Sequence, residues 1–243
     1  MNTETTTETT GPAAPLAGVR VIDMGQYIAG PGAAMVLAEL GAEVVKIEPI
    51  AGDQARHIGR YGESMIRAYS RGKRSIALDL KSEAGRAVAW RLIEGSDVLI
   101  QNLRPGAVEA LGFGPEPVRE RFPKLIYLSI SGFGNRGPSS ARPGYDVAAQ
   151  AESGLMSVTG EPDRLPQKVG VPVIDAAAGH LGAQAVLAAL YGRTRTGRGE
   201  TLRTSLLEVA LHLQATTWCD YLGGARTTSA AVGPSRSWCA GTS

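Results

Sequence analysis

An aspartate between a short apolar run and a helix of small residues is the strongest candidate for chemistry in this sequence. Val171 to Ile174 is typical of a short strand that ends at Asp175, and the alanines and glycines that follow predict a helix to about Tyr191. A carboxylate at this junction would lie near the positive end of the helix dipole, and small neighbours let a substrate approach closely. Two interpretations stay open: a catalytic carboxylate, and the N-cap that the spacing alone favours.

Other residues that bind metals or act as nucleophiles form no known pattern. His180 follows Asp175 by five residues, about 140° around a helix, so the two would not share a face. The two cysteines, Cys219 and Cys239, make neither a disulfide framework nor a zinc spacing. No H-E-x-x-H or G-x-S-x-G motif is present. We therefore expect no metal site and no serine nucleophile elbow.

Glycines and basic residues near the expected strand ends indicate where phosphates could bind. The glycines at 25, 30 and 32 do not have the G-x-G-x-x-G spacing, which argues against NAD, although the helix start there suits another phosphate-bearing ligand. Arg104 follows the fourth expected strand, the crevice position for ligands in open α/β sheets. A further basic group is either a solvated sheet edge or a phosphate site: Arg71, Lys73, Arg74 and Lys81.

The elements that must position these residues alternate between short apolar runs and helical segments. Strands are predicted at residues 19–23, 43–48, 75–80, 97–101 and 125–130, with another candidate at 201–204. Helices are predicted at residues 33–40, 82–94, 117–122, 145–158 and 205–221, and a long polar loop at 49–73. The strand–helix–strand units favour an α/β fold: a Rossmann-like open parallel sheet with helices on both faces.

Composition argues against several classes of protein. The 243-residue chain has a net charge of +2 with mixed signs and no basic block, which gives no case for nucleic-acid binding. It shows no signal-peptide pattern and no apolar run long enough to span a membrane, so we expect a cytoplasmic protein without a membrane partner. Residues 1–14, rich in Thr and Glu, are expected to form a disordered tail.

Several short segments, in this order, resemble the class III CoA-transferases, the family of formyl-CoA transferase, crotonobetainyl/carnitine CoA-transferase and the α-methylacyl-CoA racemases. The segments include Pro-Leu-Ala-Gly-Val-Arg-Val-Ile-Asp at 15–23, Leu-Gly-Ala-Glu-Val-Val-Lys-Ile-Glu-Pro at 40–49, Lys-Arg-Ser-Ile-Ala-Leu-Asp-Leu-Lys at 73–81, Asp-Val-Leu-Ile-Gln-Asn-Leu-Arg-Pro-Gly at 97–106, Asp175 with its Ala-Ala-Ala-Gly, and Thr-Gly-Arg-Gly at 196–199. The resemblance implies the N-terminal part of a large domain at 15–222, followed by an irregular, divergent tail at 223–243.

The activity that this resemblance implies is transfer of CoA between an acyl-CoA thioester and a carboxylic acid. Asp175 would attack the thioester carbonyl, form a mixed anhydride and release CoA thiolate. Coenzyme A is then a cosubstrate, and no permanently bound cofactor is implied. Matched by position, the implied CoA contacts are Ile28, Ala29, Leu78, Lys81, Asn102 and Leu103, with phosphate contacts expected from Arg71, Lys73, Arg74 or Arg104.

Two departures from the family pattern keep other functions open. The racemase branch uses Gly-His-Asp where this chain has Gly144-Tyr145-Asp146, and tyrosine is a poor acid–base group at neutral pH. We therefore expect transfer rather than racemisation of a 2-methylacyl-CoA. Family members are also longer, with a small second domain and interlocked homodimers, so the resemblance implies a C-terminally truncated member. An inactive CoA-binding remnant is the remaining alternative.

Overall fold

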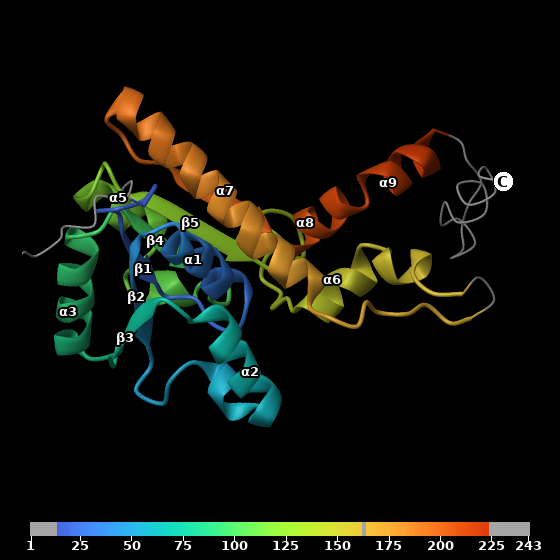
Figure 1. The fold of residues 1–243 in the computed structure, drawn as a ribbon, viewed down its shortest axis with the longest axis horizontal. Helices are drawn as coiled ribbons and strands as arrows, with labels where there is room; N and C mark the ends of the chain where they lie inside the picture. The colour runs from blue at the N-terminus through green and yellow to red at the C-terminus, as the bar shows by residue number, and fades with distance from the viewer. Residues whose placement is uncertain (1–13, 162–163, 224–243) are drawn as a thin grey trace, which may run out of the picture.

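A sheet of six parallel strands forms the centre of the computed structural model, which describes residues 14–161 and 164–223 (Figure 1). The expected tail at 1–14 lies outside the described residues except for Ala14, and so does the stretch from 224 to 243. The strand order is β3-β2-β1-β4-β5-β6, and every neighbouring pair is parallel. The strands are β1 (Arg20–Asp23), β2 (Glu43–Glu48), β3 (Lys73–Ala77), β4 (Val98–Gln101), β5 (Ile126–Ser131) and β6 (Thr201–Ser205).

Helices cover both faces of the sheet, as the sequence predicted. Strand residues alternate between two apolar clusters, so that Val98 and Ile100 of β4 face one cluster while Leu99 faces the other. The first cluster is covered by α1 (Ala29–Glu39), α7 (Val173–Thr196) and α8 (Leu206–Leu213). The second is covered by α3 (Glu83–Glu94), α4 (Ala107–Ala110) and α5 (Pro115–Arg121). The fold is therefore a three-layered α/β fold of the doubly wound type.

Small residues let α1 and α7 cross in close contact. Glycines and alanines line the facing surfaces, and a Cβ atom added to Gly179 would lie 3.2 Å from the Ala29 carbonyl oxygen and 3.2 Å from the Ala33 nitrogen. No larger side chain fits between backbones this close. Figure 1 shows α7 crossing α1. Asp175, in the first turn of α7, shares a cavity with Gln26 and Tyr27 of the loop that follows β1.

Several predicted boundaries were wrong. The loop expected at 49–73 contains a 3₁₀ helix, η1 (Gln54–His57), and α2 (Gly59–Tyr69). Gly62 is the only buried residue of α2, but Tyr61, Met65, Ile66 and Tyr69 recur at helical spacing, a pattern that the prediction of a loop overlooked. β3 begins at Lys73, two residues before the predicted start, and leaves Leu78 and Lys81 beyond its end.

The helix starts also differ from the prediction. α1 begins at Ala29 and includes Pro31 in its first turn, where a missing N–H costs no helical hydrogen bond. The expected helix at 145–158 is divided into α6 (Asp146–Glu152) and η2 (Leu155–Val158) by Gly154, whose φ is +82°. The expected helix at 205–221 is divided at Gln214 into α8 and α9 (Ala215–Leu222).

α7 has the length and apolar composition of a membrane span, contrary to the expectation from sequence. It contains 24 residues, and its most apolar stretch has a mean hydropathy of 1.4. Its buried residues, among them Ile174, Ala178 and Val186, belong to the core between α1 and the sheet. These contacts are those of a core helix in an α/β fold.

A cluster of buried, paired charges lies beneath the loop after β1. The Lys46 ammonium is 2.9 Å from Asp53 Oδ2, and the Lys73 ammonium is 2.8 Å from Asp23 Oδ2, with all four side chains at most 2% exposed. Burial alone would raise the pKa of Asp23, but the two ammonium groups hold it below its ordinary value. The Asp23 carboxylate therefore stays ionised and available to the loop.

The charge cluster holds the loop backbone through both of its acids. Asp23 Oδ1 accepts the N–H of Gly25 at 2.7 Å, and Asp53 Oδ1 accepts the N–H of Tyr27 at 3.2 Å. Lys46 also donates to the Gly25 carbonyl. These bonds hold Tyr27 at a φ of +62°, and among the described residues no other non-glycine residue has a positive φ.

We expect Gly179→Ala to destabilise the fold by about 1–3 kcal/mol, because the new methyl group meets backbone atoms of α1 that cannot move aside independently. Gly192→Ala is the matched control on the same helix, since nothing lies within 4 Å of the added Cβ; it should stabilise the protein by about 0.5–1 kcal/mol. Urea unfolding of both variants measures the difference. Equal stability of the two variants would contradict the close contact.

We expect Lys46→Met to destabilise the fold by about 3–5 kcal/mol, because it leaves the buried Asp53 carboxylate without its cation. Lys81→Met removes an exposed lysine and should change stability by less than about 0.5 kcal/mol. Thermal and urea unfolding provide the measurement. A Lys46→Met variant as stable as Lys81→Met would show that the cluster does not hold the loop.

Candidate active site

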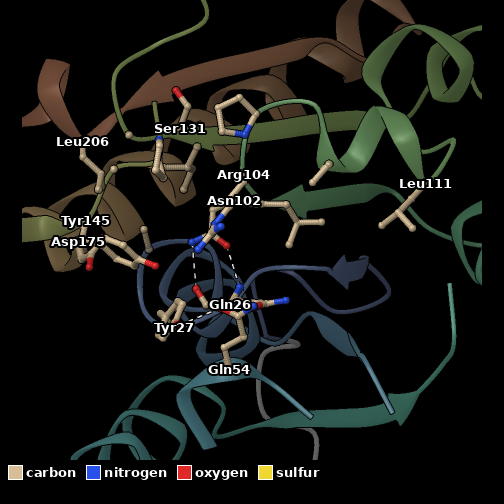
Figure 2. A pocket seen from close by; sticks show the side chains of 18 residues that line it. Gln26, Tyr27, Gln54, Asn102, Arg104, Leu111, Ser131, Tyr145, Asp175 and Leu206 are labelled. Carbon is tan, nitrogen blue, oxygen red and sulfur yellow. Dashed lines mark hydrogen bonds between the residues drawn. The ribbon is translucent and has the colours of Figure 1, made fainter. Parts of the chain in front are cut away.

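A cavity of about 290 Å³ opens at the carboxyl ends of β1, β4 and β5 (Figure 2). The chain runs outward from β1 in one direction and from β4 in the other, and loops that diverge in this way leave a crevice between them. The cavity is lined by Gln26, Tyr27, Ala29, Gln54, Asn102, Leu103, Arg104, Pro105, Ala107, Leu111, Ile130, Ser131, Gly132, Pro143, Gly144, Tyr145, Asp175 and Leu206. Residues from seven separate parts of the chain thus meet at one ligand-sized space.

Asn102 joins the two loops that form the floor of this cavity. Its Oδ1 accepts the N–H of Gln26 at 2.8 Å, and its Nδ2 donates to the carbonyl of the same residue at 3.0 Å (Figure 2). A Cβ atom on Gly30 would lie 2.8 Å from Asn102 Oδ1, so glycine is required at that position. The side chain fixes the spacing between the β1 and β4 loops.

Two tyrosines form one wall of the cavity. The Tyr27 hydroxyl donates to Gln54 Oε1 at 2.9 Å, and its ring meets the Tyr145 ring edge-on with centroids 6.1 Å apart. Figure 2 shows Asp175 and Tyr145 together on one side of the cavity and Leu111 on the other. The wall is therefore aromatic next to the candidate nucleophile, a surface that suits an apolar or planar group.

Asp175 lies inside a helix rather than at a strand-to-helix junction. α7 begins at Val173, so the predicted strand at 171–174 is wrong, and Pro172 occupies the N-cap position. Val171 is 62% exposed while Ile174 is fully buried, so residues 171–174 lead from the surface into the core and do not form a buried strand. As the third helical residue, Asp175 does not cap its own helix, and the N-cap interpretation is also wrong.

The carboxylate of Asp175 is half-buried and faces the cavity. Burial and the neighbouring carboxylate of Asp146 raise the pKa of Asp175 to about 7. None of the described residues donates a hydrogen bond to its side-chain oxygens. A carboxyl group that titrates near neutrality beside a cavity is typical of a functional site.

The structure brings together only part of the predicted CoA contacts. Ala29, Asn102, Leu103 and Arg104 line the same cavity as Asp175. Ile28 is buried beneath it, and Leu78 packs against the apolar cluster on the other face of the sheet. Four basic candidates also lie outside the cavity lining: Arg71, Lys73, Arg74 and Lys81.

The basic candidates differ in their exposure and in whether an acid of the protein already pairs with them. Lys73 is bound to Asp23 and to the Pro31 carbonyl, so its charge is already neutralised inside the protein. Arg71 is exposed and paired with Glu39, and Lys81 is exposed. Arg104 is exposed at the cavity and makes no ion pair within 14–161 and 164–223. Arg104 is thus the predicted cation best placed for an anionic ligand of the cavity.

Four residues near Asp175 were not predicted as site residues from the sequence: Gln26, Tyr27, Gln54 and Asp146. The sequence places Tyr27 in a glycine-rich loop, but its positive φ depends on a hydrogen bond to Asp53, 26 residues away, which the sequence does not reveal. His180 is exposed, and its Nδ1 lies 2.9 Å from the Ala176 carbonyl oxygen. The part of the chain that the structure describes contains no cluster of three metal-binding side chains.

Comparison with known proteins assigns a family to this arrangement. Residues 16–240 match CoA-transferase family III, a match that extends into the stretch at 223–243. The chain is 41% identical over 213 residues to a probable fatty acyl-CoA transferase of Mycobacterium tuberculosis, covering 85% of this chain and 54% of the relative. It is 42% identical over 219 residues to the succinate–glutarate CoA-transferase of Agrobacterium fabrum, covering 86% and 55%.

A solved structure supports the same assignment. The crystal structure of a CAIB/BAIF family protein from Brucella suis matches with a TM-score of 0.85 at 37% identity, covering 89% of this chain and 60% of that one. The chain spans about half the length of the curated relatives it matches. With its parallel sheet, its cavity at the strand ends and these relatives, the chain belongs to CoA-transferase family III.

Proposed function

We propose that this chain provides the nucleophile and part of the CoA site of an enzyme that transfers CoA between an acyl-CoA thioester and a carboxylic acid. The observation that carries the proposal is the Asp175 carboxylate, half-buried, free of side-chain hydrogen bonds from the described residues and facing a cavity. Relatives with this sequence pattern are named as CoA-transferases for oxalate, succinate and glutarate.

The proposed reaction uses Asp175 as a covalent relay. A carboxylate oxygen attacks the thioester carbonyl carbon, the C–S bond breaks, and CoA thiolate leaves with the electron pair. The thiolate then attacks the aspartyl carbonyl of the anhydride, which releases the donor acid and leaves an aspartyl-CoA thioester. The acceptor carboxylate displaces CoA from that thioester, and the thiolate finally attacks the acceptor's acyl carbon. Asp175 is restored as a carboxylate, so no external oxidant or reductant is needed.

The remaining lining residues suit the ligand. The Arg104 guanidinium lies at the cavity without a partner in the described chain, as a phosphate of CoA requires. Ala29, Asn102 and Leu103 present small, polar and apolar groups at the helix start and the β4 loop. Ile28, Leu78, Lys81 and Arg71 remain proposed contacts for parts of CoA beyond the cavity. Lys73 fits this role least, because Asp23 already binds it.

The wider setting of the enzyme is also a proposal. We propose a cytoplasmic protein that acts on small molecules without a nucleic-acid or membrane partner, in line with its charge pattern. The full-length family implies an interlocked homodimer, in which the other half of each chain would complete the site.

We expect Asp175 to become acylated when the chain is incubated with acetyl-, succinyl- or oxalyl-CoA. Hydroxylamine would convert the anhydride or thioester into an aspartyl hydroxamate, which peptide mass spectrometry locates. Asp175→Asn should abolish the product, while Asp220→Asn, which changes an exposed acid on α9, should retain it. A hydroxamate on another residue would remove Asp175 from its role. Exchange of the α-hydrogen of a 2-methylacyl-CoA without any adduct would favour the racemase. If the chain binds CoA but shows neither reaction, the inactive remnant would be favoured.

We expect adduct formation to depend on pH with a midpoint near 7, because only the ionised carboxylate attacks and the pKa of Asp175 is raised to about 7. The sign follows directly: below the pKa the protonated form dominates, so the rate falls roughly tenfold for each pH unit below 6 and levels off above 8. Single-turnover labelling between pH 5 and 8 measures it. A rate that is constant across this range would mean that the carboxyl is fully ionised throughout.

A further inference from the structure

A second acid, Asp146, lies where it can control the nucleophile without touching substrate. It is in the first turn of α6, and it is 8% exposed. Its Oδ2 atom accepts the backbone N–H of Ile174 at 2.8 Å and the backbone N–H of Asp175 at 2.9 Å. One carboxylate oxygen thus holds the first turn of the helix that carries the nucleophile.

The two N–H groups that Asp146 accepts are the ones a helix start leaves without partners. The N-cap position of α7 is Pro172, which has no side-chain acceptor, so a cap must come from elsewhere in the chain. A free acid in the first helical turn tends to accept such donors itself, which stabilises its ionised form and weakens it as a nucleophile. Because Asp146 occupies them, the Asp175 side chain is left to face the cavity.

Asp146 is itself held in a defined orientation. Its Oδ1 accepts a hydrogen bond from the Gln150 amide, one turn along α6. The side-chain Oε1 of Gln150 accepts the N–H of Val169 at 2.8 Å, which fixes the chain just before α7. Tyr145, the residue directly before Asp146, lines the cavity. The start of α6 therefore connects the aromatic wall of the cavity with the start of α7.

The charged and titratable groups around Asp175 come from four places. Asp146 faces it from α6, and Tyr69 at the end of α2 is close enough that burial and the Asp175 charge both raise the pKa of its phenol. Tyr27, Tyr145 and Arg104 line the same cavity. Among these, Asp146 is the group whose negative charge opposes ionisation of Asp175.

We propose that Asp146 is a positioning residue for the nucleophile: its buried carboxylate caps the start of α7 and so leaves the Asp175 carboxylate free and strongly nucleophilic. The proposal rests on the role of Asp175 given above, and it adds a reason why that carboxylate is reactive. Two like charges this close are costly, and the structure keeps the buried Asp146 directly next to Asp175, which lines the cavity.

The test is a titration of the Asp175 carboxyl carbon by ¹³C NMR in the whole chain, which needs no turnover. Asp146→Asn keeps the size and one acceptor oxygen but removes the charge, and we expect the Asp175 midpoint to fall by one pH unit or more. Glu152→Gln is the matched control: it removes a charge from the same helix, at an exposed residue paired with Arg142, and should leave the midpoint unchanged.

A second variant tests the cap. Asp146→Ala should speed hydrogen exchange of the Ile174 and Asp175 amides at least tenfold, while Glu152→Ala should not change it. An unchanged Asp175 midpoint in Asp146→Asn, in a protein with wild-type circular dichroism, would overturn the proposal even if acyl labelling of Asp175 succeeds. A shifted midpoint supports it even if no labelling occurs, so the two proposals fail separately. If Asp146→Asn does not fold, unchanged amide exchange in Asp146→Ala overturns the cap, and faster exchange supports it.

Discussion

The close crossing of α1 and α7 is the contact on which the rest of this site depends. With Gly179 pressed against the backbone at Ala29 and Ala33, the two helices meet at a distance that only hydrogen and methyl side chains allow. This contact brings the first turn of α7 to the loop after β1. Asp175 and the loop therefore face one cavity although more than a hundred residues separate them in the chain.

Charge is arranged in opposite ways above and below that loop. Beneath it, Asp23, Lys46, Asp53 and Lys73 are buried in pairs of opposite sign, and their hydrogen bonds hold the backbone of Tyr27 in a strained conformation. Behind the cavity wall, the buried acid Asp146 lies next to Asp175, and neither acid forms an ion pair with another described residue. The buried ion pairs make the loop rigid, whereas the two acids without ion pairs lie where the reaction is proposed.

Membership of CoA-transferase family III and the cavity explain each other. The proposed attack on a thioester needs a carboxylate beside an enclosed space, and the phosphates of CoA would need a cation nearby; Asp175 and Arg104 lie at the same cavity. The tyrosine at 145, where the racemase branch has a histidine, meets Tyr27 edge-on and forms a wall beside the acid. Tyr145 thus shapes the cavity wall through its contact with Tyr27.

Local features were predictable from sequence because their partners are close in the chain. Ser82 caps α3 by accepting the N–H of Gly85, three residues away, and the β-branched runs of the strands are buried on both faces, so the parallel α/β class followed from composition and spacing. Asp175 was selected through the resemblance of the chain to a family, since spacing alone favoured a cap.

Tertiary structure decided what these residues contact. Lys73 is neutralised by Asp23, 50 residues away, and α7 is capped by Asp146, 29 residues from Asp175. Such pairs depend on sheet register and helix crossing, which no short window of sequence contains.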